Sequence, residues 1–139
     1  WQVALEAAEK LDLSGKTVID CTNPIAPGLK LAVGTTTSGA EEIAARASGA
    51  RVVKAFNTTG AENMADPVYD GQATTMFICG DDPEAKATVS RLSDELGFET
   101  IDAGELSMAR NLEPFALVWI NLAMVRGHGR NIAMRLVRR

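Results

Sequence analysis

The chain has 139 residues, enough for one domain with a sizeable hydrophobic core and too few for two ordinary domains. Apolar residues make up 46% and charged residues 23% of it, which excludes a disordered or fibrous protein. The formal net charge of -4 makes nucleic acid and anionic membranes poor partners. Cys21 and Cys79 both lie in apolar stretches. We therefore expect buried thiols in a reduced, cytoplasmic protein, and neither a disulfide scaffold nor a metal site.

The sequence carries no sign of a membrane-spanning or secretory segment. Its longest apolar run extends from Leu112 to Val125 and is interrupted by Asn121, which makes it shorter than the roughly 20 residues of a transmembrane helix. The chain starts at Trp1, without a basic region followed by an apolar run. We expect either a processed chain or a fragment of a longer protein.

The first half of the chain predicts two helices alternating with two strands. Ser38 stands three residues before Glu41, a capping-box spacing that opens the second helix. Both strands are short and apolar, as expected of strands buried on both faces. A helix between apolar strands with short turns predicts a βαβ unit with parallel strands. The expected elements are helix 4–11, strand 17–21, helix 39–47 and strand 51–56.

The second half predicts one more strand–helix–strand unit and a helical end. Asp82 is a plausible N-cap, with Pro83 in the first helical position. Gly127 and Gly129 are expected to divide the helical end in two. The expected elements are a short helical piece at 61–65, strand 74–79, helix 84–96, strand 98–102 and helices within 107–139.

Short amide side chains follow the first two strands: Asn23 after one and Asn57 after the other. Ligands of open α/β sheets bind beyond the carboxyl ends of the strands, where an asparagine both donates and accepts hydrogen bonds. The alternative is that each asparagine caps its own turn, which spacing alone favours. The third and fourth strands end in Gly80-Asp81-Asp82 and Ala103-Gly104-Glu105.

The remaining polar residues give no convincing catalytic group. Asp81 and Asp82 suit a helix N-terminus better than a metal site. His128, the only histidine, lies between two glycines, which is typical of a helix C-cap or a solvent-facing residue. Arg110 could clamp a phosphate or carboxylate of a cofactor, or could pair with Glu113 three positions along a helix. Sequence alone favours the ion pair.

The segment LEPFALVWINLAMV is apolar nearly all round. Such a helix is either central to a core or covered by another subunit. Because the chain is short, we predict a homodimer built on the helix from Leu112 to Val125.

Four motifs follow one another along the chain and together cover nearly all 139 residues. They are TVIDCTNP, VVKAFNTTGAENM, FICGDDPEAKATVSRLSDELGFETIDAGELSMARNLEP and LVWINLAMVRGHGRNIAMRLVRR. In this order, the motifs resemble the family of coenzyme F420-dependent NADP oxidoreductases. The wider kin of that family are dinucleotide-binding enzymes that include the cytosolic domain of the STEAP metalloreductases.

The resemblance implies an α/β fold with an incomplete Rossmann-like, doubly wound sheet in residues 1–105. A helical C-terminal segment, residues 106–139, would serve the acceptor site and dimerisation. Family members begin with a strand, a G-x-G-x-x-G turn and a helix that bind the NADP pyrophosphate, and this sequence has no such stretch. We therefore expect weak or no NADP binding by these residues alone, and an exposed parallel sheet edge.

The resemblance also implies a cleft for two flat rings, with hydride transfer between NADP(H) and a deazaflavin (coenzyme F420) or a flavin (FMN or FAD). No catalytic side chain and no metal are needed, because the protein orients the rings and excludes water. Along the nicotinamide side it places Trp1, Asn23, Pro24, Ala55 and Asn57. Near the acceptor it places Asn57, Thr58, Arg110 and Glu113.

Two departures from the F420-using members keep the flavin alternative open. Asn57 stands where those members have a histidine, and Pro114, Phe115 and Ala116 follow the glutamate in place of their SLT-type residues. Two other functions also remain. One is an NAD(P)-dependent reductase of a small oxo acid or imine, for which Lys54 is the nearest proton donor. The other is a non-catalytic binding or dimerisation module.

Overall fold

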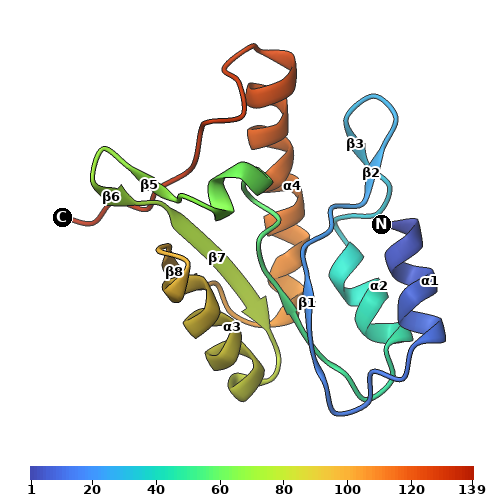
Figure 1. Cartoon of the computed structure of the whole chain (residues 1–139). Helices are drawn as coiled ribbons and strands as arrows, with labels where there is room; N and C mark the ends of the chain where they lie inside the picture. The colour runs from blue at the N-terminus through green and yellow to red at the C-terminus, as the bar shows by residue number, and fades with distance from the viewer.

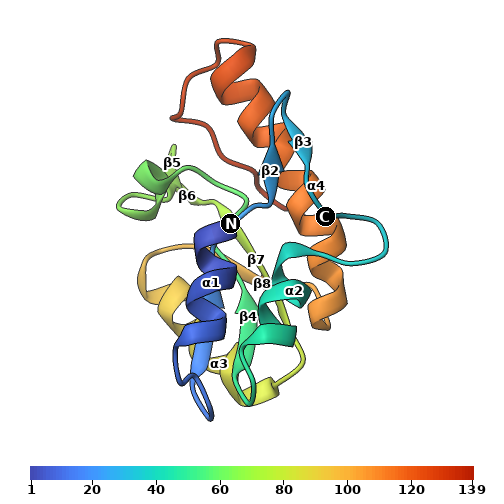
Figure 2. The same ribbon diagram turned by 90° about the vertical axis from the view of Figure 1, so that its right-hand side faces the viewer.

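The computed structural model describes all residues, 1–139, and contains a four-stranded sheet between helices (Figure 1). The strand order is β1 (Thr17–Asp20), β4 (Arg51–Lys54), β7 (Thr75–Gly80) and β8 (Glu99–Asp102). Helix α3 (Pro83–Glu95) covers one face of the sheet, and α2 (Gly39–Arg46) and α4 (Ala109–Ile120) cover the other. Helix α1 (Gln2–Lys10) packs against α2, as Figure 2 shows. The expected α/β, Rossmann-like fold is confirmed.

The sheet is mixed in direction, and this decides which strand ends meet. Strands β1 and β4 are parallel, joined through α2 as predicted. Strand β7 runs antiparallel to β4, while β8 is parallel to β7. The carboxyl ends of β1 and β4 therefore lie at one edge of the sheet, and those of β7 and β8 at the opposite edge.

The reversal before β7 follows from the connection that precedes it. The chain returns from β4 through one 3-10 turn, η1 (Ala61–Met64), and a small hairpin of β5 (Val68–Tyr69) and β6 (Gln72–Ala73). A parallel neighbour would need a crossover that covers the sheet, usually a helix. This segment has no α-helix, so the next strand pairs antiparallel.

The side chains of strand β4 alternate between the two faces of the sheet, so they contribute to the hydrophobic core on both. Val53 faces α3 and packs with Met76 and Ile78 of β7, whereas Val52 faces α2 and α4. Successive side chains of a strand point to opposite faces, so Lys54 lies on the same face as Val52. Its ammonium is therefore directed towards α2 and α4.

Both predicted helix starts are confirmed. The Ser38 hydroxyl accepts from the backbone N–H of Glu41 at 3.1 Å at the start of α2. Asp82 accepts from the backbone N–H of Ala85 at 2.8 Å, with Pro83 in the first turn of α3. Each side chain satisfies an N–H that the first helical turn leaves without a partner.

Strand β1 departs from the sequence-based expectation. It was expected to be buried on both faces, but it is the edge strand of the sheet and three of its four residues are partly exposed. An apolar, β-branched run is equally compatible with either position, because the strand pattern contains no information on its neighbours. The loop after β1 also forms an unexpected hairpin of β2 (Ile25–Ala26) and β3 (Lys30–Leu31).

The second of the two expected C-terminal helices is not formed. A short 3-10 turn, η2 (Leu106–Met108), leads into α4, which continues as one π-helical turn, η3 (Asn121–Val125). Gly127 and Gly129 then reverse the chain with positive φ angles of 78° and 75°. The tail bonds to β7 instead: Thr75 N–H donates to the Met134 carbonyl at 3.0 Å. None of the helices is long and apolar enough to cross a membrane.

Candidate functional site

Two asparagines meet at the edge where β1 and β4 end. Asn23 donates from its side-chain amide to the backbone carbonyl of Asn57 at 2.9 Å. Asn57 in return donates to the Asn23 side-chain oxygen at 3.1 Å and to the Leu112 carbonyl at 3.2 Å. The pair joins both strand ends to the start of α4. It therefore decides the alternative that sequence left open, because each amide bonds across the sheet edge and not within its own turn.

One atom of this amide pair has no partner. The side-chain oxygen of Asn57 is buried and accepts no hydrogen bond. The amide orientation is nevertheless well defined, since its nitrogen faces two acceptors. A buried acceptor without a donor typically lowers stability by about 1–3 kcal/mol. This oxygen is therefore the acceptor of the amide pair that still lacks a hydrogen bond.

The turn that delivers Asn57 has an unusual backbone. Phe56, the residue before it, has a φ of 61°, in the left-handed region that bulky residues rarely adopt. Its N–H lies 3.2 Å from the Met76 sulfur, and its ring packs edge-on against Phe98. Such backbone strain persists only where packing enforces it, and it concentrates at functional sites.

A buried ion cluster lies directly beneath the amide pair. The Lys54 ammonium is 2.8 Å from a carboxylate oxygen of Asp20 and 2.8 Å from one of Glu113. Its third hydrogen bond goes to the backbone carbonyl of Thr22. All three charged side chains are at most 1% exposed. Charges this deep are stable only when paired and fully hydrogen-bonded, which these three side chains largely are.

Glu113 also caps helix α2 from a distance. Its carboxylate accepts from the backbone N–H of Gly39 at 2.8 Å and of Ala40 at 3.0 Å. A carboxylate is stabilised at this positive end of a helix. Because Glu113 fills it, and Asp82 caps α3, neither helix start is open to a phosphate. Glu113 is fully buried. Its contacts are therefore with the start of α2 and with Lys54, and none of its surface faces solvent.

Arg110 does not pair with Glu113, contrary to the ion pair that sequence favoured. It forms a two-pronged contact with Glu41, at 2.9 Å and 2.5 Å. Glu113 points into the protein because its partners are the α2 backbone and Lys54. The spacing of residues along a helix carries no information on such distant partners. The Arg110 hydrogen bonds hold the pKa of the Glu41 carboxyl below its usual value. This contact fastens the start of α4 to the start of α2.

The other residues assigned by resemblance lie in different surroundings. Pro24 is fully buried against Gly39, and Thr58 is buried in the turn after Asn57. Ala55 belongs to the core beneath α3, and its N–H donates to the Asp20 carbonyl. Trp1 packs on the hydrophobic cluster between α1 and α2. Pro24 and Thr58 thus adjoin the amide pair, while Ala55 contributes backbone only.

The ends of β7 and β8 belong to the opposite edge of the sheet and take no part in this site. Asp81 accepts from the Leu106 N–H at 2.8 Å, and Asp82 caps α3. Lys86 bridges Asp102 and the Gly104 carbonyl. These acidic residues therefore have structural partners, in line with their expected role at a helix N-terminus.

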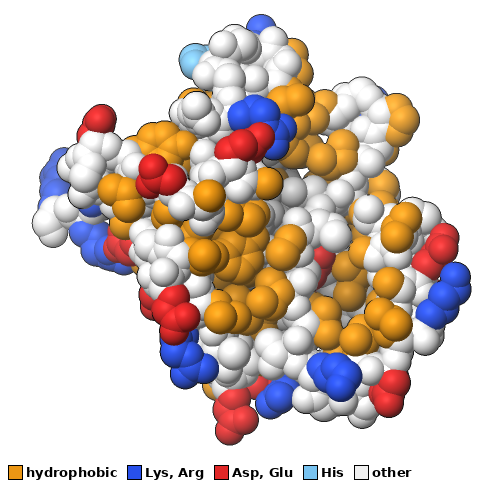
Figure 3. Space-filling view, viewed as in Figure 1, with side chains coloured by type: hydrophobic (Ala, Val, Ile, Leu, Met, Phe, Trp, Pro, Cys, Tyr) orange, Lys and Arg blue, Asp and Glu red, His pale blue; other side chains and the backbone are white.

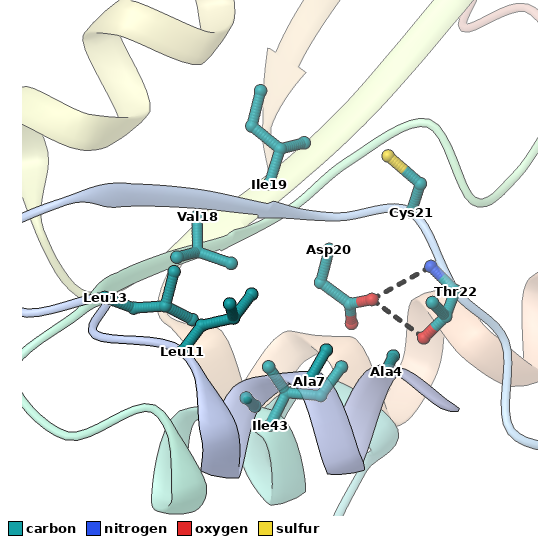
Figure 4. Close-up of a pocket in the computed structure, with 11 residues that line it drawn as sticks. Ala4, Ala7, Leu11, Leu13, Val18, Ile19, Asp20, Cys21, Thr22 and Ile43 are labelled. Carbon is teal, nitrogen blue, oxygen red and sulfur yellow. Dashed lines mark hydrogen bonds between the residues drawn. The ribbon is translucent and has the colours of Figure 1, made fainter. Parts of the chain in front are cut away.

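A hollow of about 340 Å³ lies along the free edge of β1, between that strand and α1 (Figure 4). At its polar end, Asp20 accepts from the backbone N–H and the hydroxyl of Thr22. Hydrophobic side chains gather at this place on the face seen in Figure 3. The expected exposed sheet edge is thus present, with an apolar trough beside it. The lining residues are Ala4, Ala7, Ala8, Leu11, Leu13, Val18, Ile19, Asp20, Cys21, Thr22 and Ile43.

The site provides hydrogen-bonding groups but no reactive side chain. Burial raises the pKa of the Cys79 thiol to about 12, so it is not a thiolate near neutral pH. Lys54 has all three of its donors engaged and is shielded from solvent. His128 is exposed, at the far end of α4. The site therefore supplies amide and carbonyl groups that hydrogen bonds hold in place beside an apolar face.

Comparison with known proteins identifies the kind of protein to which this site belongs. No protein-family model matches the chain. A crystal structure of a candidate F420-dependent NADP reductase from Arthrobacter sp. FB24 superposes with a TM-score of 0.87 at 34% identity, covering 99% of this chain and 64% of that one. The chain is thus similar in sequence and fold to this candidate F420-dependent NADP reductase. The resemblance drawn from its motifs is confirmed.

Two further proteins are similar to the chain, and the coverage shows how much of each protein the chain matches. Rat metalloreductase STEAP3 (Rattus norvegicus) is 37% identical over 105 residues, which are 76% of this chain and 21% of that protein. A hypothetical protein from Sinorhizobium meliloti has a TM-score of 0.72 at 25% identity, covering 99% of this chain and 63% of that one. The chain thus spans less than two thirds of each. What the chain shares with these proteins is the Rossmann-like, dinucleotide-binding fold.

Sequence reasoning missed the ion cluster at the centre of the site. In the sequence, Lys54 is a charge in an otherwise apolar strand, considered above only as the proton donor of an alternative reductase. A buried lysine needs a carboxylate, and that requirement was the available signal. It did not identify Asp20 and Glu113, which lie 34 and 59 residues away along the chain.

Proposed function

We propose that this chain forms the ring-holding part of an NADP-dependent oxidoreductase that transfers a hydride between NADP(H) and a deazaflavin or flavin acceptor. The observation that carries the proposal is the Asn23–Asn57 amide pair, at the joined ends of two parallel strands. NADP(H) supplies the hydride, and the protein supplies binding, orientation and exclusion of water.

The residues fit a nicotinamide ring in kind and in position. A carboxamide needs one acceptor and one donor in a fixed orientation, and the amide pair retains an acceptor without a donor in Asn57. Pro24 and the Phe56–Asn57 turn provide a stiff support, because the former has a fixed φ and the latter is held by packing.

On the acceptor side we place Thr58, Arg110 and the start of α4. Part of the Arg110 side chain remains exposed beside its contact with Glu41, at 38%. A guanidinium in that position is suited to a carboxylate or phosphate of F420 or FMN. Replacement of Arg110 by alanine is expected to weaken acceptor binding more than NADP binding, and equal losses would refute this placement.

The geometry argues against a reductase of oxo acids or imines. Such an enzyme needs a proton donor in contact with the substrate. Lys54 was the nearest candidate, but its ammonium is fully buried and its three donors all have acceptors. Hydride transfer between two rings requires no such group.

We further propose a homodimer through the outer side of α4 and the turn after it. Val118, Met124 and Val125 are 48%, 60% and 64% exposed in this otherwise apolar segment. An apolar hollow of about 350 Å³, with Phe77 and Phe115 in its walls, adjoins the same helix. A Val118→Glu variant should sediment as a monomer where the unmodified chain sediments as a dimer. A location in the cytoplasm, with both cysteines free, remains part of the proposal.

The proposal is tested by following NADPH oxidation at 340 nm with F420, FMN or FAD in turn, using the longest natural form of the protein. We expect turnover with one acceptor, and a loss of about tenfold or more in kcat/KM for Asn57→Ala. Asn131→Ala, an exposed amide in the C-terminal tail, is the matched control and should retain the unmodified rate. Binding of NADPH without turnover of any acceptor would instead support the non-catalytic alternative.

A further inference from the structure

The Lys54 ammonium joins three separate parts of the molecule through a single atom. Its three acceptors are Asp20 at the end of β1, the Thr22 carbonyl in the following turn, and Glu113 in α4. An ammonium has three donors and no acceptor, so this atom is fully used. The position of the Thr22 turn relative to α4 is therefore set by Lys54.

The same turn carries Asn23, and the same helix carries the carbonyl that holds Asn57. Thr22 precedes Asn23 directly, and Leu112, the acceptor for Asn57, precedes Glu113 directly. Asp20 adds two further bonds, from the Thr22 N–H at 2.9 Å and its hydroxyl at 2.8 Å. The Lys54 cluster thus holds both the turn that carries Asn23 and the part of α4 that binds Asn57.

We infer that Lys54 is a positioning residue for the ring-binding amides: it never touches the ligand, but it fixes the Asn23–Asn57 pair that does. The inference rests on the proposed function for its ligand and on the contacts above for its geometry. Stability alone gives no reason for such a group, since well-packed apolar residues commonly replace a buried ion cluster at no loss. Its directional bonds provide what apolar packing does not, a defined orientation of one turn.

The informative variant combines Lys54→Met with Asp20→Asn. It keeps the formal charge of the cluster at -1, because one positive and one negative group are removed together. The asparagine introduced in place of Asp20 would retain a side-chain oxygen for the Thr22 N–H, so the chain loses the Lys54 bonds to the Thr22 carbonyl and to Glu113. Thermal unfolding followed by circular dichroism establishes that the variant is folded.

Lys86→Met is the matched control at the other edge of the sheet. Lys86 also pairs with a carboxylate at 2.8 Å, in Asp102, and also donates to a backbone carbonyl, that of Gly104. It makes no contact with either asparagine. The control therefore removes a lysine with the same kinds of partner, in a partly exposed setting, without disturbing the proposed chain of contacts.

The readouts are the side-chain amide signals of Asn23 and Asn57 in ¹⁵N-correlated NMR spectra, and their response to reduced nicotinamide mononucleotide. In the double variant we expect about tenfold faster hydrogen exchange of the Asn57 amide and about tenfold weaker binding of the mononucleotide. The Lys86→Met control should match the unmodified chain in both. Loss of stability without these changes would indicate a purely structural lysine and overturn the inference.

The two proposals fail in different ways. Absence of any response of the unmodified chain to the mononucleotide would count against the proposed ring site, while amide exchange in the free protein still decides the role of Lys54. If the double variant does not fold, the NMR signal of the Lys54 ammonium in the unmodified chain tests the inference instead. A slowly exchanging ammonium with a scalar coupling to the Thr22 carbonyl supports the inference, and rapid exchange with water overturns it.

Discussion

Lys54 and Glu113, 59 residues apart in the chain, form an ion pair of 2.8 Å that no solvent reaches. The pair connects the last residue of β4 to the second turn of α4. Through the other oxygen of Glu113 it continues to the Gly39 N–H, the first of α2. One glutamate thus links the sheet and two helices on the same face.

Removal of the Glu113 carboxylate should be costly for stability. Glu113→Ala leaves two helix N–H groups and one N–H of the Lys54 ammonium without acceptors. Breaking a buried ion pair in this way typically costs about 3–5 kcal/mol in free energy of unfolding. Urea denaturation measures this value. Glu84→Ala, whose side chain is 88% exposed, is the control and should change it by less than about 1 kcal/mol.

The Glu41–Arg110 contact predicts a specific loss of stability in acid. The pKa of Glu41 is lowered in the folded state, chiefly by the Arg110 hydrogen bonds. Its contribution is therefore fully present above the unfolded pKa of about 4.3 and disappears as the pH falls through the lower folded value. Glu41→Gln should unfold at nearly the same urea concentration at pH 4 and pH 3 once other carboxyls are accounted for. A pH dependence identical to that of the unmodified chain would contradict the prediction.

The two cysteines should differ sharply in reactivity. Cys21 is exposed, whereas Cys79 is buried with its pKa raised to about 12 by desolvation. Iodoacetamide at pH 8 should therefore add one label per folded chain and two labels in urea, as counted by mass spectrometry. Cys21→Ser should accept no label until it unfolds. Labelling of Cys79 in the folded chain would show that its surroundings open more readily than the packing indicates.

Gly60 should not tolerate a methyl group. A Cβ at this position would lie 2.8 Å from the ring of Trp119, which cannot yield freely because its indole N–H donates to the Ile132 carbonyl. Overpacking of this kind costs about 1–3 kcal/mol, so Gly60→Ala should lower the melting temperature and alter tryptophan fluorescence. Gly34→Ala, whose Cβ would meet only the flexible end of Leu31 at 3.3 Å, is the control. Equal melting temperatures for both variants would contradict the argument.

The sequence by itself determined the local structure. Ser38, Asp82 and Pro83 marked the helix starts, and the β-branched runs marked four strands of the sheet, because caps and strand patterns act over a few residues. The motifs indicated the relatives that the comparisons then found, and the residues after the first two strands indicated the amide pair that forms there. These conclusions needed no knowledge of which elements are neighbours.

Only the tertiary structure decided how those elements meet. It reversed β7, left β1 at the edge, and replaced the last expected helix by a tail bonded to β7. It also brought Lys54 to Asp20 and Glu113, and turned Arg110 to Glu41. The physical reason is the same in each case: a backbone group or a buried charge takes the best partner in space, and the local sequence specifies only that a partner is needed.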